Sequence, residues 1–361
     1  MPAAPTPHDV GFEELFFRFE RALAEGNASA AVALVDEALD GDMEPVSLLG
    51  DVITPAQRRI GERWQRGEWS VAQEHIATGI SLAAAEAVAR RVRSLPITKG
   101  RIIVGCAERE WHALAAMVVA TCLRARGWQV TFLGAATPAE RLYSYLHQVE
   151  PDVVAVSCSV AGGLPSTRRG IESATTAGIP VLVGGAAFGK DARRARALGA
   201  TAWAPTLREG LDLADRLPAT VDPVSPLPQD VVFEQRTLDT EHHHFARRIS
   251  DRWEPAGIVD RGDIVTDTDL TLVIRDCVEQ PLRTLEGALL TGDGRLVRDV
   301  ATWVGNVLTS RAVPGSAVDA LRAEILDVVR SLPRTRAMTE KNWPPTAETG
   351  EPNENGENVE G

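Results

Sequence analysis

Apolar residues follow a helical period over residues 9–98. In "FEELFFRFERALAEG" and "NASAAVALVDEALDG" they recur every three or four positions, and both stretches end at a glycine, which is typical of an amphipathic helix and its C-cap. Two further stretches, "EPVSLLGDVITPAQRRIGERWQRG" and "SVAQEHIATGISLAAAEAVARRVRSLP", complete the set, and Ser70 is a suitable N-cap for the last one. The short connections predict an all-α bundle of about four antiparallel helices.

From residue 101 the pattern changes to short apolar runs that alternate with helical stretches. The runs are "RIIVGC", "QVTFLG", "DVVAVSCS", "PVLVGG" and "ATAWAP". Strands that alternate with helices form a parallel sheet covered on both faces. The sequence therefore predicts a flavodoxin-like, doubly wound α/β domain over residues 99–218, and ligands of such sheets bind beyond the carboxyl ends of the strands.

The rest of the chain is predicted to be a linker, a helical domain and disordered ends. Residues 219–229 are rich in proline and predict a linker. Residues 230–333 return to a helical period and predict a third, all-α domain, with Pro281 as a kink or a first-turn position. Residues 1–8 are rich in Pro and Ala, and residues 334–361 are acidic and poor in apolar residues, so we expect both to be disordered.

Composition narrows the class of protein. The chain has 361 residues, and its formal net charge of −12 argues against a surface for direct nucleic-acid binding. No apolar run approaches the roughly 20 residues that span a bilayer, and we see no signal peptide, so we expect a cytoplasmic protein. The four cysteines show no CxxC spacing, which favours buried free thiols over disulfides or a zinc site.

The loop after the first predicted strand carries the first candidate for chemistry. In "AEREWH", His112 follows Glu110 by two residues and lies at the rim of the sheet. A lone histidine there is more often structural or solvated than a ligand. However, a carboxylate that hydrogen-bonds one imidazole nitrogen fixes the tautomer and makes the other nitrogen a better metal ligand.

These residues resemble the signature of the cobalamin-binding domain family, an acid-x-His-x-x-Gly loop followed by Ser-x-Leu and Gly-Gly in later loops. "EWHALA" carries Glu110 and His112, "SCSVAGG" carries Ser157, and "LVGGAAF" carries Gly184 and Gly185. The resemblance implies that His112 binds cobalt from below in place of the dimethylbenzimidazole base. It also implies that the nucleotide tail of the cofactor passes between Ser157 and the two glycines.

Two positions depart from this signature. Ala115 replaces the usual glycine, and Ser159 stands where leucine is usual. Either side chain would narrow the tail channel, but neither change removes the cobalt ligand.

The bundle carries a second match. Trp64 is followed after nine residues by Glu74 and His75, and this Trp-x9-Glu-His pattern resembles the helical cap of cobalamin-dependent light-sensing repressors. The resemblance implies adenosylcobalamin, with Trp64 against the adenosyl group; the alternative is that Trp64 belongs to the bundle core and Glu74-His75 to a polar face. Trp69 is expected in the core. Where the repressors have a histidine that takes the upper cobalt site after light, this chain has Gln65, which leaves His75 as a candidate.

The repressors also carry an N-terminal helix-turn-helix domain. The bundle here begins near residue 9, so we expect no such domain and an output through the C-terminal domain or a partner. A cobalamin module followed by an all-α domain resembles the photocobilins, which implies a globin-like, bilin-binding domain over residues 230–333. Each candidate bilin contact there has an ordinary structural alternative. The candidates are His242, His243, His244, Cys277, Arg275 and Arg283.

The function expected from these resemblances is an adenosylcobalamin-dependent photoreceptor, not an enzyme. Its C-terminal domain would bind a bilin such as biliverdin, it would signal to an unknown protein partner, and a light-dependent homo-oligomer is our guess for its assembly. The alternatives are a corrinoid carrier of a methyltransferase system and a cobalamin sensor that does not respond to light. The sequence shows no Ser-His-Asp set and no Walker loop, the motifs that would indicate a hydrolase or a nucleotide-binding enzyme instead.

Overall fold

The computed structural model describes residues 7–253, 264–311 and 313–345. The chain divides into two compact units. Unit 1 consists of residues 1–232 and 290–293, and unit 2 of residues 233–289 and 294–361. None of the described helices combines the length and the apolar character needed to cross a bilayer.

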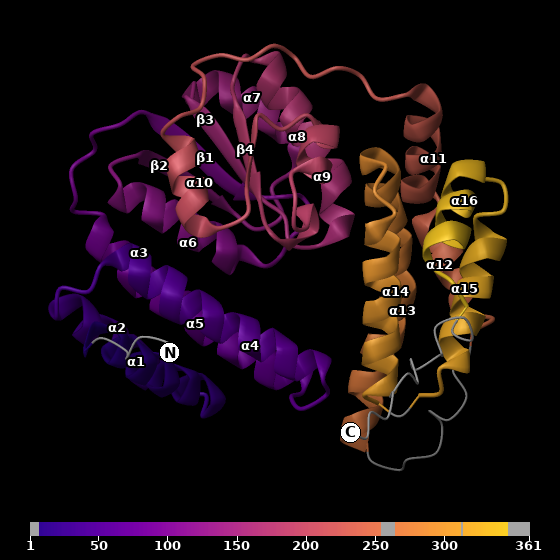
Figure 1. Cartoon of the computed structure of the whole chain (residues 1–361), viewed down its shortest axis with the longest axis horizontal. Coiled ribbons are helices and arrows are strands. Elements are labelled where there is room, and N and C mark those ends of the chain that lie inside the picture. Colours follow the sequence, from indigo (N-terminus) through magenta and orange to yellow (C-terminus); the bar gives the residue numbers. More distant parts are fainter. Residues whose placement is uncertain (1–6, 254–263, 312, 346–361) are drawn as a thin grey trace, which may run out of the picture. The chain divides into compact units, whose positions relative to one another are not determined.

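The N-terminal part of unit 1 is the predicted helical bundle, here called the cap (Figure 1). Asn27 and Ser70 cap their helices as expected, since the side chain of each accepts a backbone N–H three residues on. The third predicted helix contains a π-helical turn, η1. The cap elements are α1 (Pro7–Ala24), α2 (Ala28–Asp40), α3 (Pro45–Ser47), η1 (Leu48–Ile53), α4 (Thr54–Gln65) and α5 (Val71–Val92).

Part of the expected N-terminal disorder is wrong. Helix α1 begins at Pro7, so residues 7 and 8 are helical, and proline is favoured at the first position of a helix because its missing N–H has no partner there. Residues 1–6 of the predicted disordered stretch lie outside the described residues.

The α/β part of unit 1 follows the predicted alternation. Its strands are all parallel and pair in the order β2-β1-β3-β4-β5, which is the flavodoxin-like order. The strands are β1 (Arg101–Cys106), β2 (Gln129–Gly134), β3 (Val153–Ser157), β4 (Val181–Gly184) and β5 (Ala202–Ala204). The helices are α6 (Ala113–Ala125), α7 (Ala139–Val149), α8 (Leu164–Thr176), α9 (Arg193–Leu198) and α10 (Leu207–Ala214), with short 3-10 turns η2 (Ala161–Gly163) and η3 (Ala186–Phe188).

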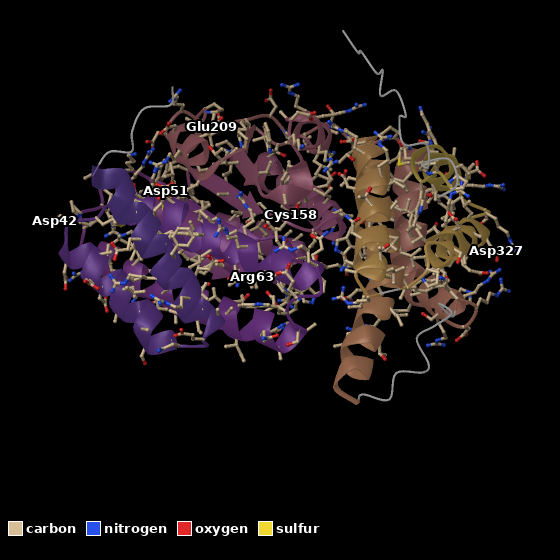
Figure 2. The ribbon with its side chains drawn as sticks, turned by 60° about the horizontal axis from the view of Figure 1, so that its bottom comes forward. Asp42, Asp51, Arg63, Cys158, Glu209 and Asp327 are labelled. Atoms are coloured by element: carbon tan, nitrogen blue, oxygen red, sulfur yellow. The ribbon has the colours of Figure 1, made fainter. Side chains whose placement is uncertain are left out.

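The cap and the sheet share one hydrophobic core. Helices α6 and α10 cover the face of the sheet towards the cap, and α7, α8 and α9 cover the other face (Figure 1). Buried apolar side chains of the cap, of α6 and of the strands belong to one cluster. At the surface, Arg208 of α10 donates to the carboxylate of Asp51, labelled in Figure 2, at 2.6 Å. The cap is therefore packed against the α6–α10 layer.

The proline-rich segment that follows α10 is attached to the α/β domain. Arg168 of α8 is buried, and its guanidinium donates to the carbonyl oxygens of Leu198 and Ser225. The backbone N–H of Val224 donates to a threonine hydroxyl of α8 at 3.2 Å. Within the predicted linker, Val224 and Ser225 thus have partners on α8.

All the described elements of unit 2 are helices, as predicted. Pro281 was expected either at a kink inside a helix or in a first turn, and it lies inside the long helix α13. The elements are α11 (Gln229–Thr240), which begins in unit 1, α12 (His242–Ser250), α13 (Ile264–Thr291), α14 (Arg295–Thr309), α15 (Ser316–Val328) and α16 (Pro333–Asn342).

The expected disorder of residues 334–361 is wrong for its first part, because α16 is an ordered helix. Thr335 and Thr339 are fully buried in it. The buried carboxylate of Glu234 accepts the backbone N–H groups of Arg334 and Thr335 at 3.0 and 2.8 Å, which caps the start of the helix. Tertiary contacts therefore stabilise a segment whose composition alone suggested disorder, and residues 346–361 lie outside the described residues.

Candidate functional site

The loop between β1 and α6 fixes the orientation of His112. The Nδ1 atom of the His112 ring lies 2.5 Å from Oε1 of Glu110, and the backbone N–H of His112 donates to the same oxygen at 2.9 Å. Because a carboxylate only accepts, the proton is on Nδ1 and the lone pair is on Nε2. The side chain of His112 is 65% exposed, so Nε2 is available to a ligand.

Glu110 is fully buried and joins two loops at the carboxyl end of the sheet. Its second oxygen, Oε2, accepts the backbone N–H groups of Ser159 and Val160 at 2.5 and 3.1 Å. Burial alone would raise the pKa of this carboxyl. The hydrogen bond and charge of His112, together with the backbone N–H groups, outweigh burial and hold the pKa below its ordinary value. Glu110 is therefore an ionised carboxylate that acts only as an acceptor.

The electrostatics of His112 follow from the same contact. The hydrogen bond to Glu110 raises the pKa of the imidazole against the opposing effect of burial, and the negative charges of Glu110 and Glu74 add to the increase. A more basic imidazole is a stronger electron-pair donor once it is deprotonated. Glu74 lies on α5, so the cap contributes to the field at the His112 ring.

A cavity of about 190 Å³ lies between the carboxyl end of the sheet and helices α6 and α10. It brings together Ser157 at the end of β3, Gly184 and Gly185 after β4, and Ala115 on α6. Its wall is largely apolar and also includes Thr54, Val104, Val118, Val119, Ala155, Val156, Leu182, Val183, Ala204, Pro205, Thr206, Leu207 and Gly210. The position where the sequence departs from the signature, Ala115, thus lies in the wall of the predicted channel.

Gly185 is required by the backbone of this wall. Its φ of 109° is rarely adopted by residues with a side chain, and a Cβ there would overlap the carbonyl oxygen of Cys158. The loops after β3 and β4 can therefore approach each other only with glycine at this position. The cavity reaches Ala115, three residues after His112, and its largely apolar wall with a few polar groups is typical of a site for a small molecule or cofactor.

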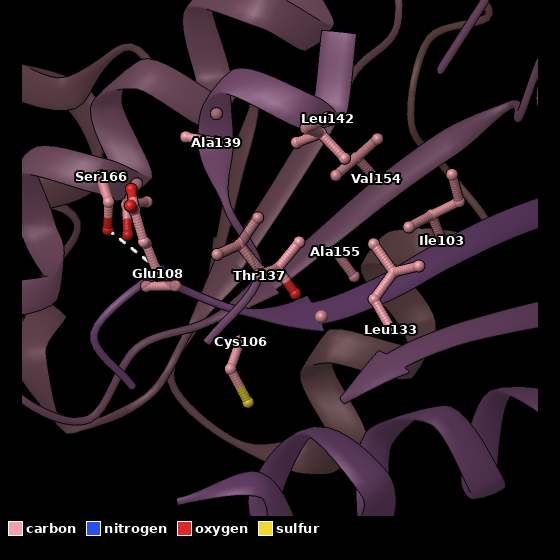
Figure 3. Close-up of a pocket in the computed structure, with 15 residues that line it drawn as sticks. Ile103, Cys106, Glu108, Leu133, Thr137, Ala139, Leu142, Val154, Ala155 and Ser166 are labelled. Atoms are coloured by element: carbon pink, nitrogen blue, oxygen red, sulfur yellow. Dashed lines mark hydrogen bonds between the residues drawn. The ribbon is translucent and has the colours of Figure 1, made fainter. Parts of the chain in front are cut away.

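A second cavity on the opposite face of the sheet is too small for such a group. Figure 3 shows it, between Thr137, Leu142 and Ser166, with the backbone N–H of Glu108 donating to the hydroxyl of Ser166. Its volume of about 20 Å³ is enough for a single water molecule. Of these two cavities, the cap-facing one, which the signature residues line, is therefore the better candidate for a ligand.

The predicted cap residues lie where α4 ends and α5 begins. Trp64 is half-buried in the last turn of α4, and Glu74 and His75 lie in the first turns of α5. Glu74 accepts a hydrogen bond from Thr78 at 2.8 Å, and Nδ1 of His75 lies 2.8 Å from the carbonyl oxygen of Val71. Both polar side chains are thus held by their own helix.

Two neighbours of these residues have different surroundings. Trp69 packs against the hydrophobic core, as expected. Gln65 is half-buried at the last position of α4.

In unit 2 the cysteine candidate for a bilin linkage is unsuited to that role. Cys277 is a free, fully buried thiol, and burial raises its pKa to about 12. Since the thiolate is the nucleophile, such a cysteine is inert. The other three cysteines are also free and buried, as predicted.

The remaining candidates of unit 2 divide between buried and exposed positions. His242 is buried, with Nε2 3.8 Å from a carboxylate oxygen of Glu279, whereas His243 and His244 are exposed. Arg275 is exposed. The guanidinium of Arg283 lies 3.1 and 3.0 Å from the carboxylates of Asp239 and Glu286, so ion pairs within the domain account for it.

Sequence reasoning missed several parts of the site. The N–H groups of Ser159 and Val160 hold Glu110, and Thr54 of the cap lines the cavity. No motif marks Thr54, although Thr206 could have been expected at the rim because it follows β5. Among the described residues no three His, Cys, Asp or Glu side chains gather as a metal site.

Two segments of the chain match family models, and each model is described as a B12 binding domain. One match covers residues 15–88 in the cap, and the other covers residues 100–211 in the α/β domain. Together they include the bundle, the His112 loop and the cavity.

Curated relatives fall into two groups. The chain is 31% identical over 158 residues to the HTH-type transcriptional repressor CarH of Myxococcus xanthus; the match covers 43% of this chain and 52% of the repressor, about half of its length. It is 24% identical over 188 residues to trimethylamine corrinoid protein 1 of Methanosarcina acetivorans, covering 50% of this chain and 86% of that protein.

A solved structure has the same fold as the first part of the chain. The monomethylamine corrinoid protein of Methanosarcina barkeri matches with a TM-score of 0.50 and 18% sequence identity, over 56% of this chain and 97% of that one. The cap and the α/β domain thus share the architecture of a corrinoid protein. The fold of this solved structure thus agrees with the two B12 binding domain matches, one over the helical cap and one over the α/β domain.

Proposed function

We propose that this protein is an adenosylcobalamin-dependent photoreceptor in which His112 is the lower ligand of cobalt. The observation that carries the cobalamin part is the Glu110–His112 pair, which presents a fixed Nε2 lone pair beside a cavity lined by Ser157, Gly184 and Gly185. His112 would bind the metal, and Glu110 would keep its ring oriented. The cavity would take the nucleotide tail and exclude water from it.

The adenosyl form and the response to light rest on the Trp-x9-Glu-His resemblance of the cap. When bound, adenosylcobalamin supplies a weak cobalt–carbon bond that light breaks. Trp64 would pack against the adenosyl group, and Glu74, held by Thr78, would offer it a hydrogen-bond acceptor. The adenosyl group would contact both the cap and the sheet before illumination and neither of them afterwards. A switch requires such a difference in contacts between its two states.

The test is a comparison of spectra. Purified protein is loaded with adenosylcobalamin in the dark, and its absorption is recorded before and after green light. We expect a permanent spectral change, and we expect His112→Ala to weaken binding, whereas His147→Ala on α7 should not. A bound cofactor whose spectrum ignores light would leave a light-independent cobalamin sensor as the better reading.

A second candidate function is a corrinoid carrier for a methyltransferase. It is favoured by the similarity to trimethylamine corrinoid protein 1, most of whose length is matched. The two functions differ in the group that the cap accommodates. A photoreceptor should bind adenosylcobalamin more tightly than methylcobalamin and lose this preference in Trp64→Ala, whereas a carrier should accept the methyl form at least as well.

For the C-terminal helices we propose non-covalent binding of a bilin such as biliverdin in a globin-like domain. Buried Cys277 cannot serve as an attachment point, which leaves His242 as the candidate contact. Biliverdin added to the purified protein should shift its red absorption band, and the pigment should be released on denaturation. We also propose a signalling role through a protein partner and a light-dependent homo-oligomer, which light scattering in dark and light would test.

A further inference from the structure

One residue of the cap lines the cavity of the α/β domain. Thr54, at the start of α4, belongs to the wall that also contains Ser157 and Gly185. Its backbone N–H and its hydroxyl both donate to the carbonyl oxygen of Leu49, the hydroxyl at 2.8 Å. These two bonds hold the backbone and the side chain of Thr54 in one orientation. The cap thus contributes a fixed side chain to this cavity.

Thr54 directly follows the π-helical turn η1. Its N–H therefore reaches back five residues, to Leu49, where an α-helix would reach back four. Pro55 comes next in the chain, and a proline within a helix has no N–H to donate and crowds the carbonyl group four residues before it. A wider turn at this point is compatible with both restrictions. Single π turns within helices are frequent at functional sites.

The same turn packs against α10, whose first residues form another part of the cavity wall. A Cβ added to Gly50 of η1 would lie 3.2 Å from Cδ2 of Leu207. Leu207 and Thr206 both line the cavity. Next to this contact, Arg208 of α10 donates to the carboxylate of Asp51 in η1 at 2.6 Å. Leu207 therefore contacts the cap and also borders the cavity.

We infer that η1 and Thr54 form part of the site for the nucleotide tail, so that the cap contacts the tail of the cofactor as well as its upper face. This inference rests on the proposed cobalamin function, in which the cavity takes the tail. Thr54 acts through its shape, because its hydroxyl donates to Leu49 within the cap. Gly50 acts through Leu207, which it leaves room for.

The cap then has two attachments to the cofactor that differ in their response to light. The contact with the upper organic group is lost when that group leaves, whereas the contact with the tail does not involve it. Packing of the cap and binding of the tail favour each other, since the coupling between two binding events is reciprocal. After illumination the cap would therefore remain attached at η1.

The probes are hydroxocobalamin and aquocobinamide, which has the corrin ring and cobalt but no nucleotide tail. Neither has an organic group on its upper face, so the comparison reports on the tail. Wild type should bind hydroxocobalamin more tightly. In Gly50→Ala the new methyl group crowds Leu207, and the free space beside Leu207 is the cavity. This variant should bind hydroxocobalamin about three- to tenfold more weakly, and aquocobinamide within about twofold of wild type.

Thr54→Leu tests the cap residue of the wall itself. The larger side chain should weaken hydroxocobalamin binding by roughly tenfold and leave aquocobinamide binding within about twofold. Thr54→Val is its control, because it keeps the branched shape and loses only the hydroxyl. Gly61→Ala in α4 is the control for Gly50→Ala, since nothing lies within 4 Å of its added Cβ. Both controls should keep the wild-type ratio of the two affinities.

Equal weakening of both corrinoids in Gly50→Ala and Thr54→Leu would overturn the inference, because the cap would then support the fold and not the tail site. Unchanged binding of hydroxocobalamin in both variants would do the same. Melting curves from circular dichroism show which variants are folded, and Gly50→Ala decides the question if Thr54→Leu is not. Failure of wild type to bind hydroxocobalamin, or unchanged binding by His112→Ala, would instead refute the proposed function and the inference with it.

Discussion

Replacing Glu110 with glutamine tests the central contact of the site. The carboxylate accepts N–H groups of His112 on one oxygen and those of Ser159 and Val160 on the other. A glutamine amide keeps one acceptor oxygen and replaces the other with an NH2 group. In either orientation, one set of N–H donors faces another donor. The substitution therefore preserves shape and volume but leaves buried donors without partners.

The size of the effect follows from the number of stranded donors. A buried donor that loses its acceptor costs about 1–3 kcal/mol. If the amide NH2 faces His112, the imidazole can accept on Nδ1 by changing tautomer and only the backbone N–H of His112 is stranded, so a destabilisation of about 1–3 kcal/mol is expected. For a domain of this size that lowers the melting temperature by roughly 2–12 °C. Because the ring of His112 also loses its orienting partner, cobalamin affinity should fall by about 10–100-fold.

The matched control is Glu108→Gln on the same loop. The Glu108 side chain is 38% exposed and pairs with Arg169 at 2.9 Å, a surface contact worth about 0–1 kcal/mol. Thermal unfolding followed by circular dichroism, and titration of cobalamin followed by absorption, give both quantities for both variants. If Glu110→Gln melts and binds cobalamin like Glu108→Gln, the buried carboxylate does not orient His112 and the site has been misread.

Three further predictions concern pH, the cavity wall and the segment after α10. The pKa of His112 is raised above its ordinary 6.5, so the stability from its contact with Glu110 is present below pH 6.5 and is lost as the pH rises through the higher folded pKa. Protons compete with cobalt for the imidazole, so cobalamin affinity measured against pH should rise with a midpoint above 6.5. In Glu110→Gln this midpoint should be lower than in wild type. Gly185→Ala should cost about 2 kcal/mol or more in denaturant unfolding, whereas Gly79→Ala, with open space around it in α5, should stabilise by about 0.5–1 kcal/mol. Arg168→Met should destabilise unit 1 by about 1–3 kcal/mol, because the buried carbonyl oxygen of Leu198 loses its donor and Ser225 loses its attachment to α8, and a melting curve equal to wild type would contradict this.

The elements of unit 1 were predictable because their periodicities are strong and regular. The strands of the sheet have near-continuous apolar runs, and His112 stands at a junction where the period changes from strand to helix. The family signature then identified both walls of the cavity, at Ser157 and at Gly184–Gly185. These features depend on local pattern, which the sequence carries directly.

The contacts that complete the site depend on residues far apart in the chain. Ser159 and Val160 lie about fifty positions from Glu110 and contribute backbone N–H groups, which have no sequence signature. Thr54 reaches the cavity only because the cap packs on α10. Helix α16 was missed for a related reason, since the buried carboxylate of Glu234, one hundred residues away, stabilises its first turn.

The attachment of Ser225 to Arg168 changes where the α/β domain effectively ends. A chain cut after α10 would retain the buried guanidinium of Arg168 but lose a carbonyl oxygen that accepts from it, so this truncated form should be less stable than one that ends at residue 226. Proteases need several residues of extended, accessible chain, and residues 219–225 are held by hydrogen bonds at several points. Limited proteolysis of the native protein should therefore spare this stretch, even though its proline-rich sequence resembles an open linker.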